Sequence, residues 1–124
     1  MGSVVHFEIP ADDVSRAQHF YRQAFGWEVS EMPGMGYTIL STTKTDERGM
    51  PTTPGAINGG LAKRADPLTA PIITIDVEDI DQALQHVESL GGSIVQGRQD
   101  VGGMGFTAYF RDTEGNTMGM WQNA

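Results

Sequence analysis

The sequence has 124 residues, no cysteine and a formal net charge of −8 at neutral pH. The length fits one domain, and the lack of thiols excludes disulfides, zinc–thiolate sites and cysteine nucleophiles. The negative charge argues against nucleic acid and anionic membranes as partners, and because no signal peptide or bilayer-spanning run is present we expect a cytoplasmic protein.

The first half of the chain predicts a strand, a helix and three more strands. Val4–Ile9 alternates as a strand does. Asp12 or Asp13 then caps a helix that ends at Phe25. The polar segment 43–54 contains glycine and prolines and predicts an exposed, mobile loop. The three later strands are predicted at 27–29, 37–41 and 55–61.

The second half repeats this order after a linker at 62–71. Ile72–Val77 is the strongest predicted strand, and Asp79 caps a helix that runs to Leu90. The last strands are predicted at 94–95, 106–110 and 117–122.

A shift of 66 residues superimposes the two halves. It brings Asp13 onto Asp79, Val14 onto Ile80, Ala17 onto Ala83 and Gly26 onto Gly92. Unrelated segments rarely share both the start and the end of a helix in register, so we infer an internal duplication. The single domain, residues 1–124, then consists of two βαβββ modules, at 3–61 and 72–123.

Two segments carry a resemblance to a known superfamily. They are the helix end, with Phe20-Tyr21 and Phe25-Gly26-Trp27, and the turn Arg111-Asp112-Thr113-Glu114-Gly115-Asn116. With the paired modules, the chain resembles the vicinal oxygen chelate superfamily, which includes glyoxalase I, extradiol dioxygenases and bleomycin-resistance proteins. The resemblance covers nearly the whole chain. It implies an α+β fold whose modules form a pseudo-two-fold pair, with curved mixed sheets around a cup and the helices outside.

In the metal-dependent members, each module supplies one ligand from its first strand and one from its last. Carried onto this chain, three of these positions are His6, Ile72 and Gly119, and the fourth falls among 57–60, where Asn58 is at best a weak ligand. At most one strong ligand remains. We therefore expect no metal ion and no other cofactor.

Strand alternation selects the side chains that face the cup. Because Phe7 is expected to face the helix, His6 and Glu8 face the cup. His6 is the cup residue that titrates near neutrality, so it is the candidate acid–base group, with Glu8 as the group that tunes it. The residues expected to bind a small molecule are Tyr37, Asn58, Ile72, Thr74, Tyr109, Gly119 and Trp121. Phe110 and Met104 are further candidates for the pocket wall.

Three functions stay open. The first is a metal-free binding protein that holds an apolar or aromatic organic molecule. The second is a metal-independent lyase or isomerase that uses His6. The third is a metal-dependent glyoxalase or dioxygenase with ligands from other positions. We also expect a homodimer, because open sheet edges usually need to be covered.

Overall fold

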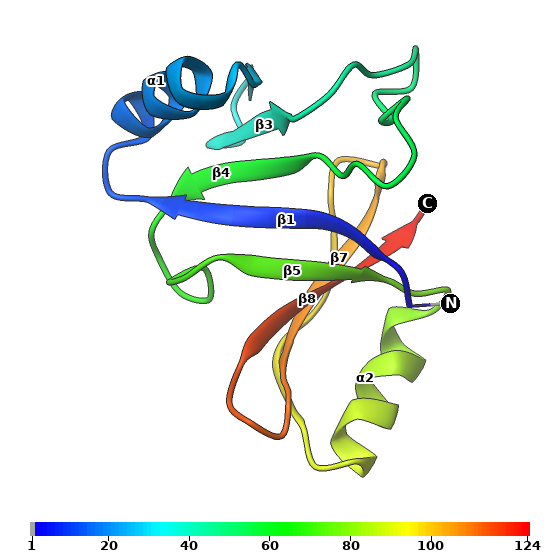
Figure 1. The fold of residues 1–124 in the computed structure, drawn as a ribbon. Helices are drawn as coiled ribbons and strands as arrows, with labels where there is room; N and C mark the ends of the chain where they lie inside the picture. Colours follow the sequence, from blue (N-terminus) through cyan, green and yellow to red (C-terminus); the bar gives the residue numbers. More distant parts are fainter. Residues whose placement is uncertain (1) are drawn as a thin grey trace. The chain divides into compact units, whose positions relative to one another are not determined.

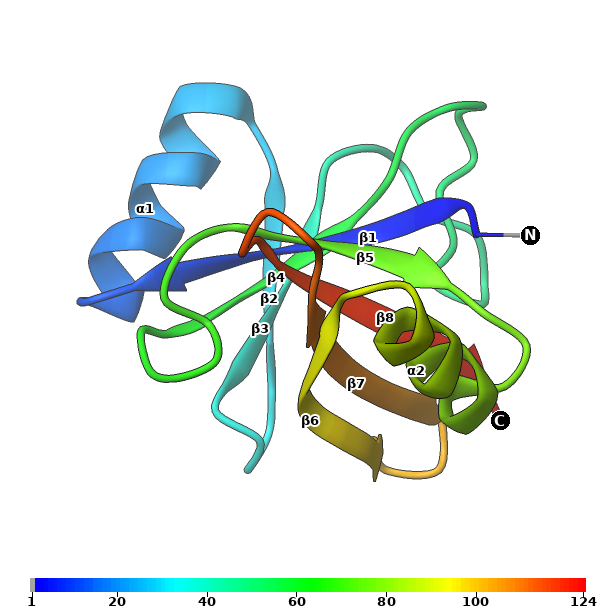
Figure 2. The ribbon, with the colours of Figure 1, turned by 90° about the horizontal axis from the view of Figure 1, so that it is seen from below.

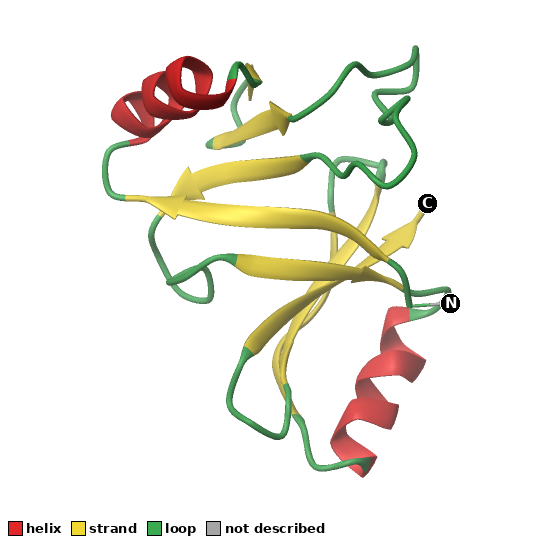
Figure 3. Ribbon diagram, in the orientation of Figure 1, coloured by secondary structure: helices red, strands yellow, loops and turns green. Residues whose placement is uncertain are grey.

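The computed structural model describes residues 2–124 and contains, within them, eight strands and two helices (Figure 3). The fold class is α+β, as the sequence predicted. The chain divides into two compact units. The first unit is residues 6–71, and the second unit is residues 72–124 with the segment up to Val5. The cup and the pseudo-two-fold pairing concern the placement of one unit against the other and stay predictions.

The first unit holds one helix and a mixed sheet in the strand order β2-β3-β4-β1. Its elements are β1 (Val4–Ala11), α1 (Val14–Phe25), β2 (Glu28–Met32), β3 (Tyr37–Ser41) and β4 (Gly59–Lys63). β1 and β4 run parallel, as their arrowheads show (Figure 1), whereas the other neighbours are antiparallel.

The second unit has the same topology, with the strand order β5-β8-β7-β6. Its elements are β5 (Ile72–Asp76), α2 (Ile80–Ser89), β6 (Ser93–Asp100), β7 (Gly105–Arg111) and β8 (Thr117–Asn123). The first and last strands, β5 and β8, are again the parallel pair. Two units with one topology are what the predicted duplication requires.

Both helices begin where the sequence indicates. The Asp13 carboxylate accepts a hydrogen bond from the Arg16 amide at 3.0 Å, and the Asp79 carboxylate accepts one from the Gln82 amide at 3.1 Å. These bonds satisfy amides that have no partner inside the helix. Gly26 ends α1 in the left-handed conformation, at φ 70°, where a residue without Cβ is least strained.

Each helix covers one face of its own sheet. In the first unit, buried Leu40 and Leu61 meet α1 through Val14 and Ala17. In the second unit, α2 lies beside β7 and β8 (Figure 2), and its Ile80 and Leu84 are buried in the core there. The side chains of β1 and β5 alternate as predicted, since Phe7, Ile9 and Ile75 pack on the helix side. Val77, just after β5, packs there too. Phe110 is also part of this core, so its suggested place in a pocket wall is wrong.

One connection differs from expectation, and another has local hydrogen bonds that were not predicted. β4 continues to Lys63, inside the segment taken as linker. The loop at 43–54 is held by its own hydrogen bonds: Asp46 accepts from the amides of Arg48 and Met50, at 2.8 and 3.0 Å. Polar composition alone does not reveal such local pairing.

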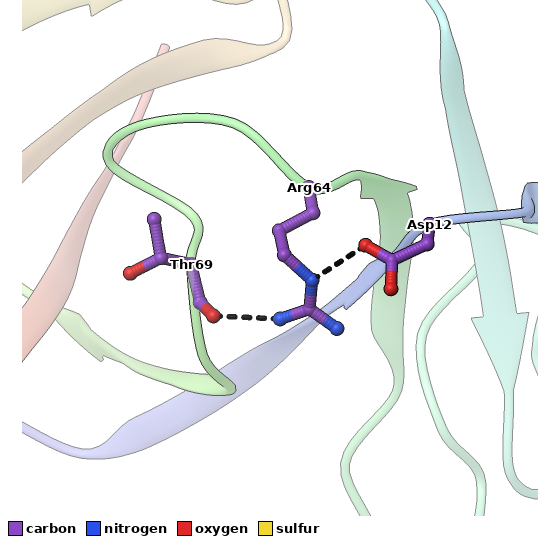
Figure 4. A network of polar contacts seen from close by, with 3 residues as sticks. All are labelled: Asp12, Arg64 and Thr69. Carbon is purple, nitrogen blue, oxygen red and sulfur yellow. Dashed lines mark hydrogen bonds and ion pairs between the residues drawn. The ribbon is translucent and has the colours of Figure 1, made fainter.

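The segment after β4 is fastened by Arg64. Its guanidinium forms an ion pair with Asp12 at 2.8 Å and donates to the carbonyl of Thr69 at 2.6 Å (Figure 4). Arg64 therefore ties the segment after β4 to Asp12, the residue that follows β1. Neither α1 nor α2, the helices of residues 2–124, is long and apolar enough to cross a bilayer.

Candidate functional site

The face of the first unit's sheet that does not pack against α1, called here the helix-free face, carries the polar residues predicted from the sequence. His6 and Glu8 reach it from β1, because Phe7 and Ile9 point to the helix side. Glu8 lies opposite Gly60 of β4 in the sheet register. Tyr37, the first residue of β3, lies over Gly60 on the same face.

A hydrogen bond of 2.7 Å joins His6 Nε2 to the Tyr37 hydroxyl. The two rings are nearly parallel, with an interplanar angle of 17° and centroids 6.4 Å apart. A Cβ at position 60 would collide with the phenol ring. Glycine at this position therefore provides the space in which Tyr37 reaches His6.

Burial lowers the pKa of His6 below its ordinary value of 6.5, and the neighbouring Glu8 carboxylate partly opposes this shift. Removal from water disfavours the charged imidazolium, whereas a nearby negative charge favours it. Glu8 is itself only 8 % exposed. The result is a neutral imidazole at neutral pH, with a carboxylate close enough to stabilise it if it gains a proton.

Asn58 lies just before β4, at the base of the loop. Its Oδ1 accepts hydrogen bonds from the amide and the hydroxyl of Thr42, at 2.9 and 3.3 Å. Its Nδ2 is buried and has no hydrogen-bond partner within the described part of the chain. The carbonyl end of Asn58 therefore closes the loop, and only the amide nitrogen has unused hydrogen-bonding capacity.

The second unit places the remaining predicted residues on its own helix-free face. Thr74 is opposite Gly119 in the register, and Tyr109 is opposite Gly119 on the other side. A Cβ at position 119 would lie 2.8 Å from Thr74 Oγ1 and 3.5 Å from Ile72 Cγ2. These two side chains are 5 % and 2 % exposed, so they occupy the space that the glycine leaves.

Trp121 completes this group from the end of β8. Its indole covers Gly105 and donates to Asn123 Oδ1 at 2.9 Å. Met104, a candidate for a pocket wall, is 52 % exposed in the turn before β7.

The sequence located His6 and Tyr37 but missed their contact. Finding it required the pairing of β3 with β4, which brings Tyr37 opposite Ala62 and next to Gly60. The two adjacent glycines at 59 and 60 were the available signal, since glycine inside a strand often marks the close approach of another group.

Comparison with known proteins shows the relatives of this chain. A family model described as bleomycin resistance protein-like N-terminal matches residues 3–43. A "Glyoxylase-like domain-containing protein" of Didymella fabae is 32% identical over 94% of this chain and 90% of its own length. The "Putative glyoxylase CFP32" of Mycobacterium bovis is 28% identical over 93% of this chain, which spans only 43% of that relative.

Solved structures share the fold at low identity. A glyoxalase/bleomycin resistance protein/dioxygenase superfamily member from Vibrio splendidus is 20% identical, with a TM-score of 0.63 over the full length of both chains. A methylmalonyl-CoA epimerase, solved in complex with methylmalonyl-CoA and NH4+, is 16% identical, with a TM-score of 0.67 over 100% of this chain and 96% of that one. At these identities the likeness concerns the fold alone.

Proposed function

We propose that this chain, which belongs to the glyoxalase/bleomycin resistance/dioxygenase (vicinal oxygen chelate) superfamily, binds an apolar or aromatic organic molecule on the helix-free face of its first unit. The observation that carries this proposal is the His6–Tyr37 pair, a partly buried polar contact between two nearly parallel rings. Small-molecule sites typically combine apolar walls with a few placed polar groups. The matching family model is named for resistance to a small-molecule drug, which agrees with such a role.

We propose that binding needs no metal ion. A divalent ion in this superfamily would use the first and last strands, where this chain has His6, Ile72 and Gly119, and where Asn58 already gives its oxygen to Thr42. Isoleucine and glycine offer no side-chain donor, so these positions do not fit a divalent ion. Among residues 2–124, no three His, Asp or Glu side chains lie together as a metal-binding group.

Elemental analysis tests the metal-free proposal. After mild chelation and reconstitution with manganese, iron, nickel, zinc or cobalt, we expect much less than one ion per chain. One tightly held ion per chain would contradict it and would favour the metal-dependent alternative.

A second candidate function is a metal-independent lyase or isomerase. The lowered pKa of His6 favours it, because burial removes the imidazole from water and leaves a neutral base beside Tyr37. Perturbed histidines occur at catalytic sites, although structural networks also produce them.

The binding proposal is tested with anisole, an apolar aromatic probe, titrated into ¹⁵N-labelled protein. We expect saturable shifts of the amide signals of His6, Tyr37 and Gly60. His6→Ala should weaken binding and leave the fold stable, whereas Phe7→Ala, on the helix side, should cost about 3–5 kcal/mol of stability. Equal destabilisation by both variants, or no saturable shift at these three amides, counts against the proposal.

We further propose that two copies associate through a sheet edge. β6 is the outermost strand of the second unit's sheet, and seven of its eight residues are exposed. Unpaired edge strands present free backbone donors and acceptors to another chain. Light scattering should give a dimer mass at micromolar concentration, and a monomer mass would contradict this. The cytoplasmic location stays a prediction.

A further inference from the structure

The length of the His6–Tyr37 hydrogen bond suits a hydroxyl donor. At 2.7 Å, the contact has the usual length for a hydroxyl donor and lies at the short end of the range of about 2.7–3.2 Å for an N–H donor. A neutral imidazole can accept at Nε2, and we infer that Tyr37 donates its hydroxyl hydrogen there. The imidazole then carries its own hydrogen on Nδ1.

A phenol oxygen that donates its hydrogen still has two acceptor lone pairs. We propose that Tyr37 and His6 form a proton relay, in which the Tyr37 oxygen receives a hydrogen from a hydroxyl or N–H group of the ligand while Tyr37 passes its own hydrogen to His6 Nε2. The inference rests on the proposed binding role and adds the class of ligand: an organic molecule that offers an O–H or N–H hydrogen. In this arrangement Tyr37 meets the ligand, and His6 acts through Tyr37.

The step balances without another reactant. The ligand loses one proton and becomes an anion, Tyr37 loses one and gains one, and His6 becomes an imidazolium. Glu8 lies on the same face of β1, and its carboxylate favours the imidazolium. The other side chains that β3 and β4 turn to this face, at positions 39, 41, 60 and 62, are Ile, Ser, Gly and Ala, and none of them is charged.

Gly60 is the feature that makes the relay possible. Any side chain at this position would displace the phenol and break its contact with His6. The second unit has no equivalent relay, because Ile72 stands at the position of His6 and Thr74 fills the space beside Gly119. The relay is thus a property of the first unit and does not follow from the repeated fold.

The polarity is tested by NMR on protein labelled with ¹⁵N in histidine. Signals of His6 are assigned by their loss in His6→Gln, which separates them from those of His19 and His86. At pH 7 we expect a neutral ring with hydrogen on Nδ1 and none on Nε2, and Tyr37→Phe should shift the Nε2 signal. Hydrogen on Nε2 in the wild-type protein would overturn the proposal, and this result does not depend on how well the variant folds. An Nε2 signal that Tyr37→Phe leaves unchanged would also overturn it.

The ligand class is tested by comparing phenol with anisole, which has the same ring but no hydroxyl hydrogen. We expect phenol to bind about 2- to 10-fold more tightly, the range for one net hydrogen bond, and Tyr37→Phe to abolish the difference. If both probes bind equally, the binding role stands and the relay fails. If neither binds, both proposals fail.

Discussion

The two units share a topology but differ on their helix-free faces. In the first unit, Glu8 pairs with Gly60 in the register, and His6 meets a tyrosine above that glycine. In the second unit, Thr74 pairs with Gly119 and itself fills the space above the glycine. The same parallel pair of strands thus supports a titratable pair in one unit, whereas in the other a threonine fills the space at the equivalent glycine.

The packing of the helices differs in the opposite sense, because the helix of the second unit is the more deeply buried one. α2 buries Ile80 and Leu84 completely or nearly so, whereas no residue of α1 is fully buried. α1 instead ends in an aromatic cluster, in which Tyr21 stacks on Trp27 at 5.1 Å. The comparison indicates that the second unit is the firmer scaffold and that the ionisable chemistry lies in the first. A duplicated fold can therefore keep its backbone while the roles of its halves separate.

The largest expected effect concerns the helix cores. Ile80 is 0% exposed, so Ile80→Ala should cost about 2–5 kcal/mol, because it removes buried methylenes and leaves a cavity. Val14 is its counterpart at the shift of 66 and is only partly buried, so Val14→Ala should cost clearly less. Urea denaturation of both variants measures the difference. Equal costs would mean that the two helices are anchored alike.

The two adjacent glycines of β4 face opposite sides of the sheet, so substituting each one tests the core and the candidate site separately. Gly59→Ala would press on the Phe7 ring on the helix side and should cost about 1–3 kcal/mol by overpacking. Gly60→Ala would press on Tyr37 on the other side and should change the His6 Nε2 signal. We expect Gly59→Ala to leave that signal unchanged. The distinction fails if both variants alter His6 to the same extent.

Local patterns in the sequence were sufficient to predict the fold class. Asp13 and Asp79 cap their helices, and the alternation of β1 and β5 gave the correct facing of Phe7 and Ile75. Two elements were predicted poorly. β4 was predicted at 55–61 and is observed at Gly59–Lys63, because its glycines carry no periodic apolar pattern. β6 was predicted at 94–95 and is observed at Ser93–Asp100, because its later residues are polar or glycine.

The site was predictable only residue by residue. His6 could be placed on its face by alternation, but its partner Tyr37 is 31 residues away in the sequence and reaches it through the register of β3 on β4. The bond between Thr42 and Asn58 likewise depends on how the loop closes. Such contacts follow from strand pairing, which a single sequence alone does not specify.

The helix caps should respond alike in the two units. Asp13→Ala and Asp79→Ala each remove one side-chain bond to an otherwise unpaired helix amide, so each should cost about 1 kcal/mol. Chemical denaturation of the two variants under identical conditions gives the comparison. A cost confined to one variant would show that the two helix starts are not equivalent.

The smallest effect concerns the pH dependence that His6 adds to the first unit and that Ile72 cannot add to the second. Burial lowers the pKa of His6 in the folded protein below the unfolded value of 6.5. As the pH falls through that value, the unfolded chain takes up a proton that the folded chain does not, so stability decreases. The loss ends below the folded pKa, where both states are protonated.

His6→Gln removes this pH-dependent contribution to stability but keeps an acceptor for the Tyr37 hydroxyl, and the other titrating groups stay the same in both proteins. Between about pH 7.5 and 5.5 the wild type should therefore lose more unfolding free energy than His6→Gln. Equal losses would show that Glu8 balances burial, and a wild type that gains stability relative to the variant on acidification would show that Glu8 outweighs it. Either result would mean that burial does not hold His6 neutral beside Tyr37.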